Sequence, residues 1–279
     1  MPLDPDRLFP IDPSARKIAQ DLYRTVVNLP IISPHGHTEP RWFADNDCFP
    51  DPAQLFVTPD HYVFRMFYSQ GVSLESLGVP RVDGGLTETD GRKIWRLFAE
   101  NYHLLRATPS RMWIDYSFEH VFGVTDVFSP KTADAFYDHI ANCLSRDEFR
   151  PRQLFDRFEI EVLSTTENAL DQLTHHKTIQ SSSWTGRVIT AYRPDNVIDP
   201  DFEGFTENVA RLGQLTGEDT SNWAGYLAAH RNRRAFFKAH GATSSDHGHP
   251  TARTECLTQT DAAALFEKAL LGGCSPDEA

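Results

Sequence analysis

The chain has 279 residues, of which 40% are hydrophobic and 24% charged, a balance typical of a globular enzyme with a sizeable core. Its net charge of −12 argues against a nucleic-acid partner, which requires a basic face for the phosphates. Its 4 cysteines include no Cys-x-x-Cys pair, which excludes a zinc ribbon and gives no sign of a disulfide framework.

The chain shows no targeting or membrane signal. No basic segment followed by an apolar core opens it, and no apolar stretch is long enough to cross a bilayer. We therefore expect a cytoplasmic protein with reduced thiols and no membrane partner.

The first predicted elements are a helix and a strand. Apolar residues at helical spacing predict a helix over 13–27, capped by Ser14, and the apolar run 29–34 predicts a buried strand. His35 and His37 follow, separated by a glycine, and residues i and i+2 of an extended chain project to one face. The two histidines are candidate ligands of one metal ion, and the alternative is that they are ordinary surface or packed imidazoles.

A long helical block comes next. A helix is expected to start near Asp60 and to close at Gly71, and helical patterns continue through 87–123, 131–144 and 150–158. Because a parallel α/β protein normally shows strands more often, this block predicts a mainly helical insertion, residues 41–158, within a single domain that spans residues 1–279.

Strands and helices alternate after the insertion. The predicted strands are 159–166, 186–195 and a short strand with a polar loop at 241–248, and the predicted helices are 169–176, 202–216, 221–240 and 261–271. This alternation predicts an α/β fold, either a (β/α) barrel or an open parallel sheet.

Polar residues follow each predicted strand. In a barrel these strand ends meet at one mouth, so His35 and His37 are expected to approach Arg193 and Asp246. The guanidinium of Arg193 suits a bidentate grip on a carboxylate, and Asp246 suits a hydrogen bond to a sugar hydroxyl or the movement of a proton. The set predicts a metal site that faces an anion site.

Each of these motifs has a purely structural alternative. For Arg193 and Asp195 the alternative is a local ion pair in a turn, and for Asp246 it is a cap of its own loop. His175 and His176 have no partner at a useful spacing, and the basic residues of 231–234 resemble an exposed helix face. We expect both groups to face solvent.

Taken together and in order, the motifs resemble the uronate isomerase (glucuronate isomerase) family of the amidohydrolase superfamily. The matching stretches are 30–37, 60–65, Thr165-Thr166, 192–195 and 240–248. The resemblance implies a distorted (β/α)8 TIM-type barrel with a helical insertion after the first strand. It also implies an aldose-ketose isomerase of carbohydrate metabolism that interconverts D-glucuronate and D-fructuronate, and D-galacturonate and D-tagaturonate.

The resemblance assigns residues to these roles. It implies that His35 and His37 bind a divalent metal, with zinc as the first choice and manganese, iron or cobalt as alternatives. That metal polarises the oxygen on which charge develops while a proton moves between C2 and C1 through a cis-enediol.

The same resemblance implies the contacts to the sugar. Arg193 binds the carboxylate of the uronate and His61 also contributes to substrate binding, while Tyr62 and Asp246 contact the sugar near the proton that moves. For His61 and Tyr62 the structural alternative is an ordinary pair of residues on a helix.

Two departures from the family pattern stand out. The family usually follows its paired threonines with two aspartates and a proline, whereas this chain continues with Glu167. Family members also run further, and their last strands bring an aspartate, an arginine and a tryptophan to the site. We therefore expect a C-terminally truncated barrel, whose open strand edge favours a homo-oligomer. The alternatives for function are a metal-dependent hydrolase or decarboxylase of the same superfamily, or a catalytically inactive remnant.

Overall fold

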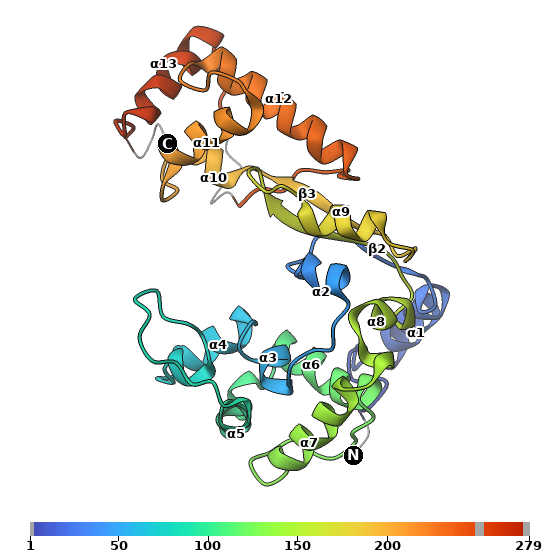
Figure 1. Cartoon of the computed structure of the whole chain (residues 1–279). Helices are drawn as coiled ribbons and strands as arrows, with labels where there is room; N and C mark the ends of the chain where they lie inside the picture. Colours follow the sequence, from blue (N-terminus) through green and yellow to red (C-terminus); the bar gives the residue numbers. More distant parts are fainter. Residues whose placement is uncertain (1–2, 249–253, 276–279) are drawn as a thin grey trace. The chain divides into compact units, whose positions relative to one another are not determined.

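The computed structural model describes residues 3–248 and 254–275 (Figure 1). Its contacts divide the chain into two compact units. One unit combines Met1–Leu29 with Asp47–Leu154, and the other combines Pro30–Asn46 with Phe155–Ala279. Within the described ranges, no helix is both long and apolar enough to span a membrane.

The first unit is helical. Its elements are α1 (Pro13–Val26), α3 (Pro52–Phe56), α4 (His61–Tyr68), α5 (Gly91–Asn101), α6 (Pro109–Tyr116) and α7 (Ala133–Leu144), with short turns η1 (Glu75–Leu77), η2 (Tyr102–Leu105), η3 (Ser117–Val121) and η4 (Asp147–Phe149). Its core is aromatic: Trp95 and Phe98 are fully buried, and the indole N–H of Trp95 donates to the carbonyl of Ala133 at 2.9 Å. Because a buried donor left unpaired is costly, this bond ties α5 to α7.

The predicted helices of this unit are confirmed, with one wrong cap. α1 begins at Pro13, but its cap is Asp12, whose carboxylate accepts the amide of Ala15 at 2.8 Å, because Ser14 already lies inside the first turn. α4 is capped by Asp60 as predicted. Gly71 has a φ of +92°, the left-handed conformation expected just after a helix.

The second unit is a small parallel sheet with helices. The strands β1 (Ile31–Ser33), β2 (Ile160–Asn168) and β3 (Val188–Arg193) pair in the order β1-β2-β3. Tyr192 of β3 also makes a parallel bridge to Ser245. The helices are α2 (Pro40–Asp45), α9 (Thr174–Ser181), α10 (Asp195–Ile198), α11 (Phe205–Thr216), α12 (Trp223–Ala239) and α13 (Gln259–Leu270), and α8 (Pro151–Arg157) leads into β2. The predicted α/β class with parallel strands is confirmed.

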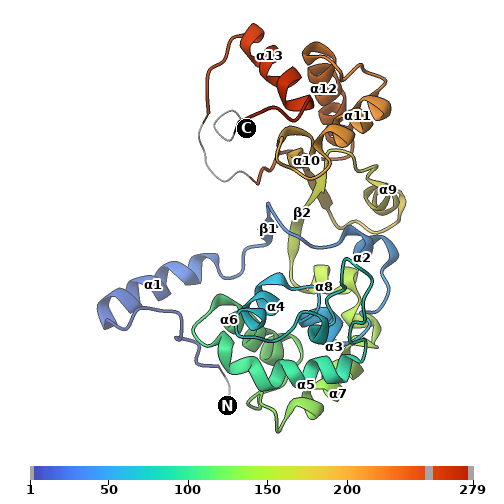
Figure 2. The same cartoon turned by 90° about the vertical axis from the view of Figure 1, so that its left-hand side faces the viewer.

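The helices of this unit pack into its larger core. Figure 2 shows α10, α11, α12 and α13 gathered together. Phe205 and Leu212 of α11 and Phe237 of α12 are buried in one cluster with Tyr192 of β3. This packing fixes β3 against α12 and so positions the residues at the end of β3.

Two expectations for the strands and helices of this unit are wrong. Ile31 and Ile32 are 49% and 62% exposed, because β1 is an edge strand of the three-stranded sheet rather than a buried one. The helix expected over 169–176 begins only at Thr174. The carboxylate of Asp171 accepts the amide of Leu173 at 2.6 Å, a local turn that delays the helix.

Candidate active site

The carboxyl ends of the parallel strands bring distant residues together. β1 ends at Ser33, just before His35, and the amide of Asp246 donates to the carbonyl of Tyr192 at 3.0 Å, beside Arg193. Because parallel strands end at the same edge of a sheet, these side chains converge. His35, Asp246 and Arg193 form a continuous chain of contacts in the second unit.

The two histidines have the geometry of a metal-binding pair. Their Nε2 atoms are 3.2 Å apart, and their rings lie at 76° to each other with centroids 5.0 Å apart. Two ligands of a tetrahedral zinc ion are roughly 3.3–3.4 Å apart when each bond is about 2.0–2.1 Å. The pair therefore fits a shared ion. In the described part of the chain no group of three or more His, Cys, Asp or Glu residues surrounds a common ion position.

Asp246 connects the histidine pair to the arginine. Its Oδ2 atom is 3.3 Å from Nδ1 of His35 and 3.3 Å from Nη1 of Arg193. A carboxylate on one ring nitrogen orients the imidazole and leaves the other nitrogen for a metal. Among the described residues, the partners of this carboxylate come from two other strand ends. Asp246 therefore does more than cap its own loop, because it contacts His35 and Arg193.

Arg193 lies between two carboxylates. Its Nε donates to Oδ2 of Asp195 at 2.7 Å, so the local ion pair of the structural alternative is present, together with the contact to Asp246. A guanidinium has five N–H donors, more than these two contacts use. A β-carbon on Gly248 would lie 2.9 Å from Nη2 of Arg193, so this glycine leaves the room that the guanidinium occupies.

Asp195 is held as a carboxylate by its surroundings. Burial opposes its ionisation, but the amide of Gly248, which donates to it at 3.0 Å, and the charge of Arg193 outweigh burial and hold the pKa of Asp195 below its ordinary value. Asp195 and Gly248 are therefore positioning residues for Arg193. In the sequence, the position of Asp195 two residues after Arg193 indicated this role for Asp195.

His61 and Tyr62 belong to the other, helical unit, where they are the first two residues of α4. Their rings lie against each other, with centroids 4.3 Å apart, and Tyr62 is 70% exposed. Its phenol is thus available to a ligand. Of the six candidate residues, the structure brings four together in the second unit.

Thr165 and Glu167, polar residues expected at the end of a strand, form a buried network with His176, which the sequence did not predict. The hydroxyl of Thr165 lies 3.0 Å from Nε2 of His176 and donates to the carboxylate of Glu167 at 2.5 Å, and Thr190 on β3 also donates to Glu167. His176 is only 1% exposed, so its expected solvation is wrong: α9 starts at Thr174 and turns this residue toward the sheet. Burial lowers the pKa of His176, and the charge of Glu167 partly opposes this.

The basic stretch 231–234 is only partly an exposed face. Arg233 is 4% exposed and donates to the carbonyls of Ala169 at 2.8 Å and Asp171 at 2.6 Å. Its guanidinium thereby holds the connection between β2 and α9. The sequence alone does not show this, because the two carbonyls lie more than 60 residues away.

Known proteins match nearly the whole length of the chain. The family model described as glucuronate isomerase matches residues 14–278. A uronate isomerase of Rhizobium meliloti is 58% identical over 276 residues, which are 99% of this chain and 59% of that protein. A uronate isomerase of Mesorhizobium japonicum is 59% identical over 275 residues, which are 99% of this chain and 58% of that protein.

Solved structures agree with this match. The crystal structure of glucuronate isomerase from Caulobacter crescentus has a TM-score of 0.94 and 49% identity, covering 99% of this chain and 58% of that one. Uronate isomerase from Thermotoga maritima has a TM-score of 0.87 and 27% identity, covering 100% and 58%. This chain thus spans somewhat under two thirds of the length of these relatives. With the family model matching residues 14–278 and the sequence motifs in their expected order, the chain belongs to the glucuronate isomerase family.

Proposed function

We propose that the chain supplies active-site residues to a uronate isomerase that interconverts D-glucuronate and D-fructuronate, and D-galacturonate and D-tagaturonate. The observation that supports this most directly is the contact chain His35–Asp246–Arg193, in a protein 58% identical to a uronate isomerase. It combines a metal-binding pair, a carboxylate and a guanidinium within one polar cluster.

In this proposal Arg193 binds the carboxylate of the uronate. Asp195 and Asp246 accept from its Nε and Nη1. We propose that the N–H donors not used in these two contacts bind the carboxylate of the uronate. The side chain is 28% exposed, so it is anchored at the surface of the site and still reachable. Arginine suits this role because its fork matches a planar carboxylate.

Asp246 is proposed to move the proton. As a base it takes the proton from C2, the C–H electron pair forms the C1–C2 double bond, and the carbonyl oxygen at C1 gains a proton to give the cis-enediol. Return of a proton to C1 and loss of the hydroxyl proton at C2 complete the ketose. Tyr62 is proposed to contact the sugar oxygens near this transfer, and His61 to hold the substrate.

His35 and His37 are the proposed metal ligands, and Asp246 orients the first of them. Zinc is the first choice, and manganese, iron or cobalt also suit imidazole ligands. When bound, such a metal supplies Lewis-acid polarisation of the substrate oxygen.

The wider setting is also a proposal. The parallel strands and the bridge at Ser245 support a distorted (β/α)8 barrel in which residues 41–158 form a mainly helical insertion. The exposed Ile31 and Ile32 on the edge strand support self-association. We also propose a cytoplasmic location and no nucleic-acid partner.

Turnover of D-glucuronate to D-fructuronate tests the proposal. It should be measured on this chain and on a chimera that adds the part of the Rhizobium relative outside the matched region. In whichever form is active, Arg193→Met should raise KM by about tenfold or more, because a charge-assisted contact to the uronate is lost. Arg211→Met, an exposed change of the same charge on α11, is the matched control.

The outcomes separate the alternatives. An unchanged KM in Arg193→Met would place the anion site elsewhere. Absence of isomerisation in both proteins, with their folds intact, would favour the hydrolase, decarboxylase or inactive-remnant alternatives.

A further inference from the structure

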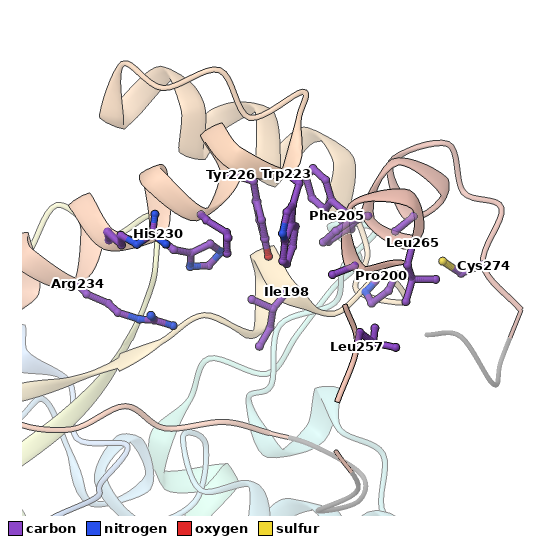
Figure 3. Close-up of a pocket in the computed structure, with 15 residues that line it drawn as sticks. Ile198, Pro200, Phe205, Trp223, Tyr226, His230, Arg234, Leu257, Leu265 and Cys274 are labelled. Carbon is purple, nitrogen blue, oxygen red and sulfur yellow. The ribbon is translucent and has the colours of Figure 1, made fainter. Parts of the chain in front are cut away.

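A cavity of about 450 Å³ lies in the sheet-containing unit along α12 (Figure 3). The helix lines it with one stripe of residues at spacings of three and four: Trp223, Tyr226, Leu227, His230, Arg231 and Arg234. Residues three and four apart lie on the same face of a helix. The stripe is apolar toward the start of α12 and cationic toward its end.

The apolar part of the cavity is built from stacked rings. Trp223 and Tyr226 stack with centroids 5.6 Å apart, and Phe266 of α13 stacks on Tyr226 at 4.4 Å. Figure 3 shows Trp223 and Tyr226 side by side beneath α12. Flat rings of this kind offer an aromatic ligand a surface on which to stack.

The cationic part holds two guanidinium groups. Arg231 and Arg234 both line the cavity and are exposed, and in the described ranges no carboxylate pairs with either of them. The chain as a whole has a net charge of −12, so two cations beside an aromatic wall make this part of the surface locally positive. Two neighbouring guanidinium groups favour an anionic ligand.

Between the two parts lies a buried polar atom that no described residue pairs with. His230 is 4% exposed, its Nδ1 is 2.9 Å from the hydroxyl of Tyr192, and among the described residues its Nε2 has no hydrogen-bond partner. Burial, together with the charge of Arg234, lowers the pKa of His230 to about 4, so the ring is neutral at pH 7. When the Tyr192 hydroxyl donates to Nδ1, Nε2 carries a proton that it can donate to a ligand.

We propose that this cavity is a second binding site, one that takes a flat aryl carboxylate. The aryl body lies against Trp223 and Phe266, and the carboxylate meets Arg231, Arg234 and the Nε2–H of His230. The cavity volume falls within the range of about 300–1,000 Å³ that is usual for small-molecule sites. The stacked rings distinguish this cavity from the polar cluster of His35, Asp246 and Arg193.

Calorimetric titration of the whole chain with three probes tests the proposal. 1-Naphthoate carries both features of the ligand, 1-naphthylmethanol keeps the rings without the charge, and D-glucuronate keeps the charge without the rings. We expect 1-naphthoate to bind at one saturable site about tenfold more tightly than 1-naphthylmethanol. D-glucuronate should not displace it.

Variants locate the binding. Arg231→Met or Arg234→Met should each weaken 1-naphthoate by about tenfold and leave 1-naphthylmethanol unchanged, whereas Arg211→Met, an exposed change on α11, should alter neither. Ala262→Trp, which places an indole in the cavity, should abolish binding of both naphthyl probes while far-ultraviolet circular dichroism confirms the fold.

Three results would overturn the proposal. The first is 1-naphthoate that binds no more tightly than its neutral analogue, or does not bind at all. The second is a loss of affinity for 1-naphthoate in Arg211→Met that is as large as the loss in Arg234→Met. The third is unchanged binding of the naphthyl probes by a folded Ala262→Trp variant.

Discussion

Substitutions of Asp246 test whether this residue orients the metal ligand His35 without binding the metal itself. Its Oδ2 atom lies 3.3 Å from Nδ1 of His35, on the ring edge away from the nitrogen that faces His37. Asp246→Asn keeps an acceptor but removes the charge, so zinc affinity should fall by about tenfold. Asp246→Leu removes the acceptor as well, and the loss should approach about a hundredfold, the upper end for such partners.

The assay is competition for Zn²⁺ between the protein and a chromophoric chelator, with His35→Ala to show that the titrated ion sits at the histidine pair. Asp195→Asn is the matched control, because in the described part of the chain this carboxylate contacts Arg193 and not His35. Equal zinc affinity in the Asp246 variants and the native chain, with both folded, would refute the orienting role.

Three further predictions concern the same unit. Gly248→Ala places a methyl group 2.9 Å from Nη2 of Arg193, so in an active form KM for D-glucuronate should rise while kcat changes little; an unchanged KM would contradict the predicted displacement of the guanidinium. Arg233→Met leaves two carbonyls unpaired and should lower the free energy of unfolding by about 3 kcal/mol, against about 0.5 kcal/mol for exposed Arg231→Met, in urea titrations. His230 has its pKa lowered from 6.5 to about 4 by burial, so between these values the unfolded chain binds a proton that the folded chain does not. Stability should therefore fall as the pH falls from 6.5 to 4, by roughly 3 kcal/mol in all, and folded His230→Gln should lack this part of the pH dependence.

Helices and their caps could be predicted from the sequence alone. The helix that begins at Pro13 follows from its apolar spacing, and the one that begins at His61 also has Asp60 as a cap. Both follow from interactions within a few neighbouring residues, which sequence records directly. The ordered motifs also identified the family, which the match to residues 14–278 confirms.

Properties that depend on packing between distant segments were not readable in this way. His176 looked solvated, but the late start of α9 buries it against Thr165. Arg233 looked like part of a charged helix face, but two carbonyls more than 60 residues earlier in the chain accept its donors. Sequence patterns predict which side of an element is polar, not which partner that side meets.

The candidate site combines both kinds of information. The His-Gly-His spacing already placed two imidazoles on one face, because alternate residues of an extended chain point the same way. That Asp246 contacts both His35 and Arg193 required the fold, since these residues are 211 and 53 positions away from it and meet only where parallel strands end together.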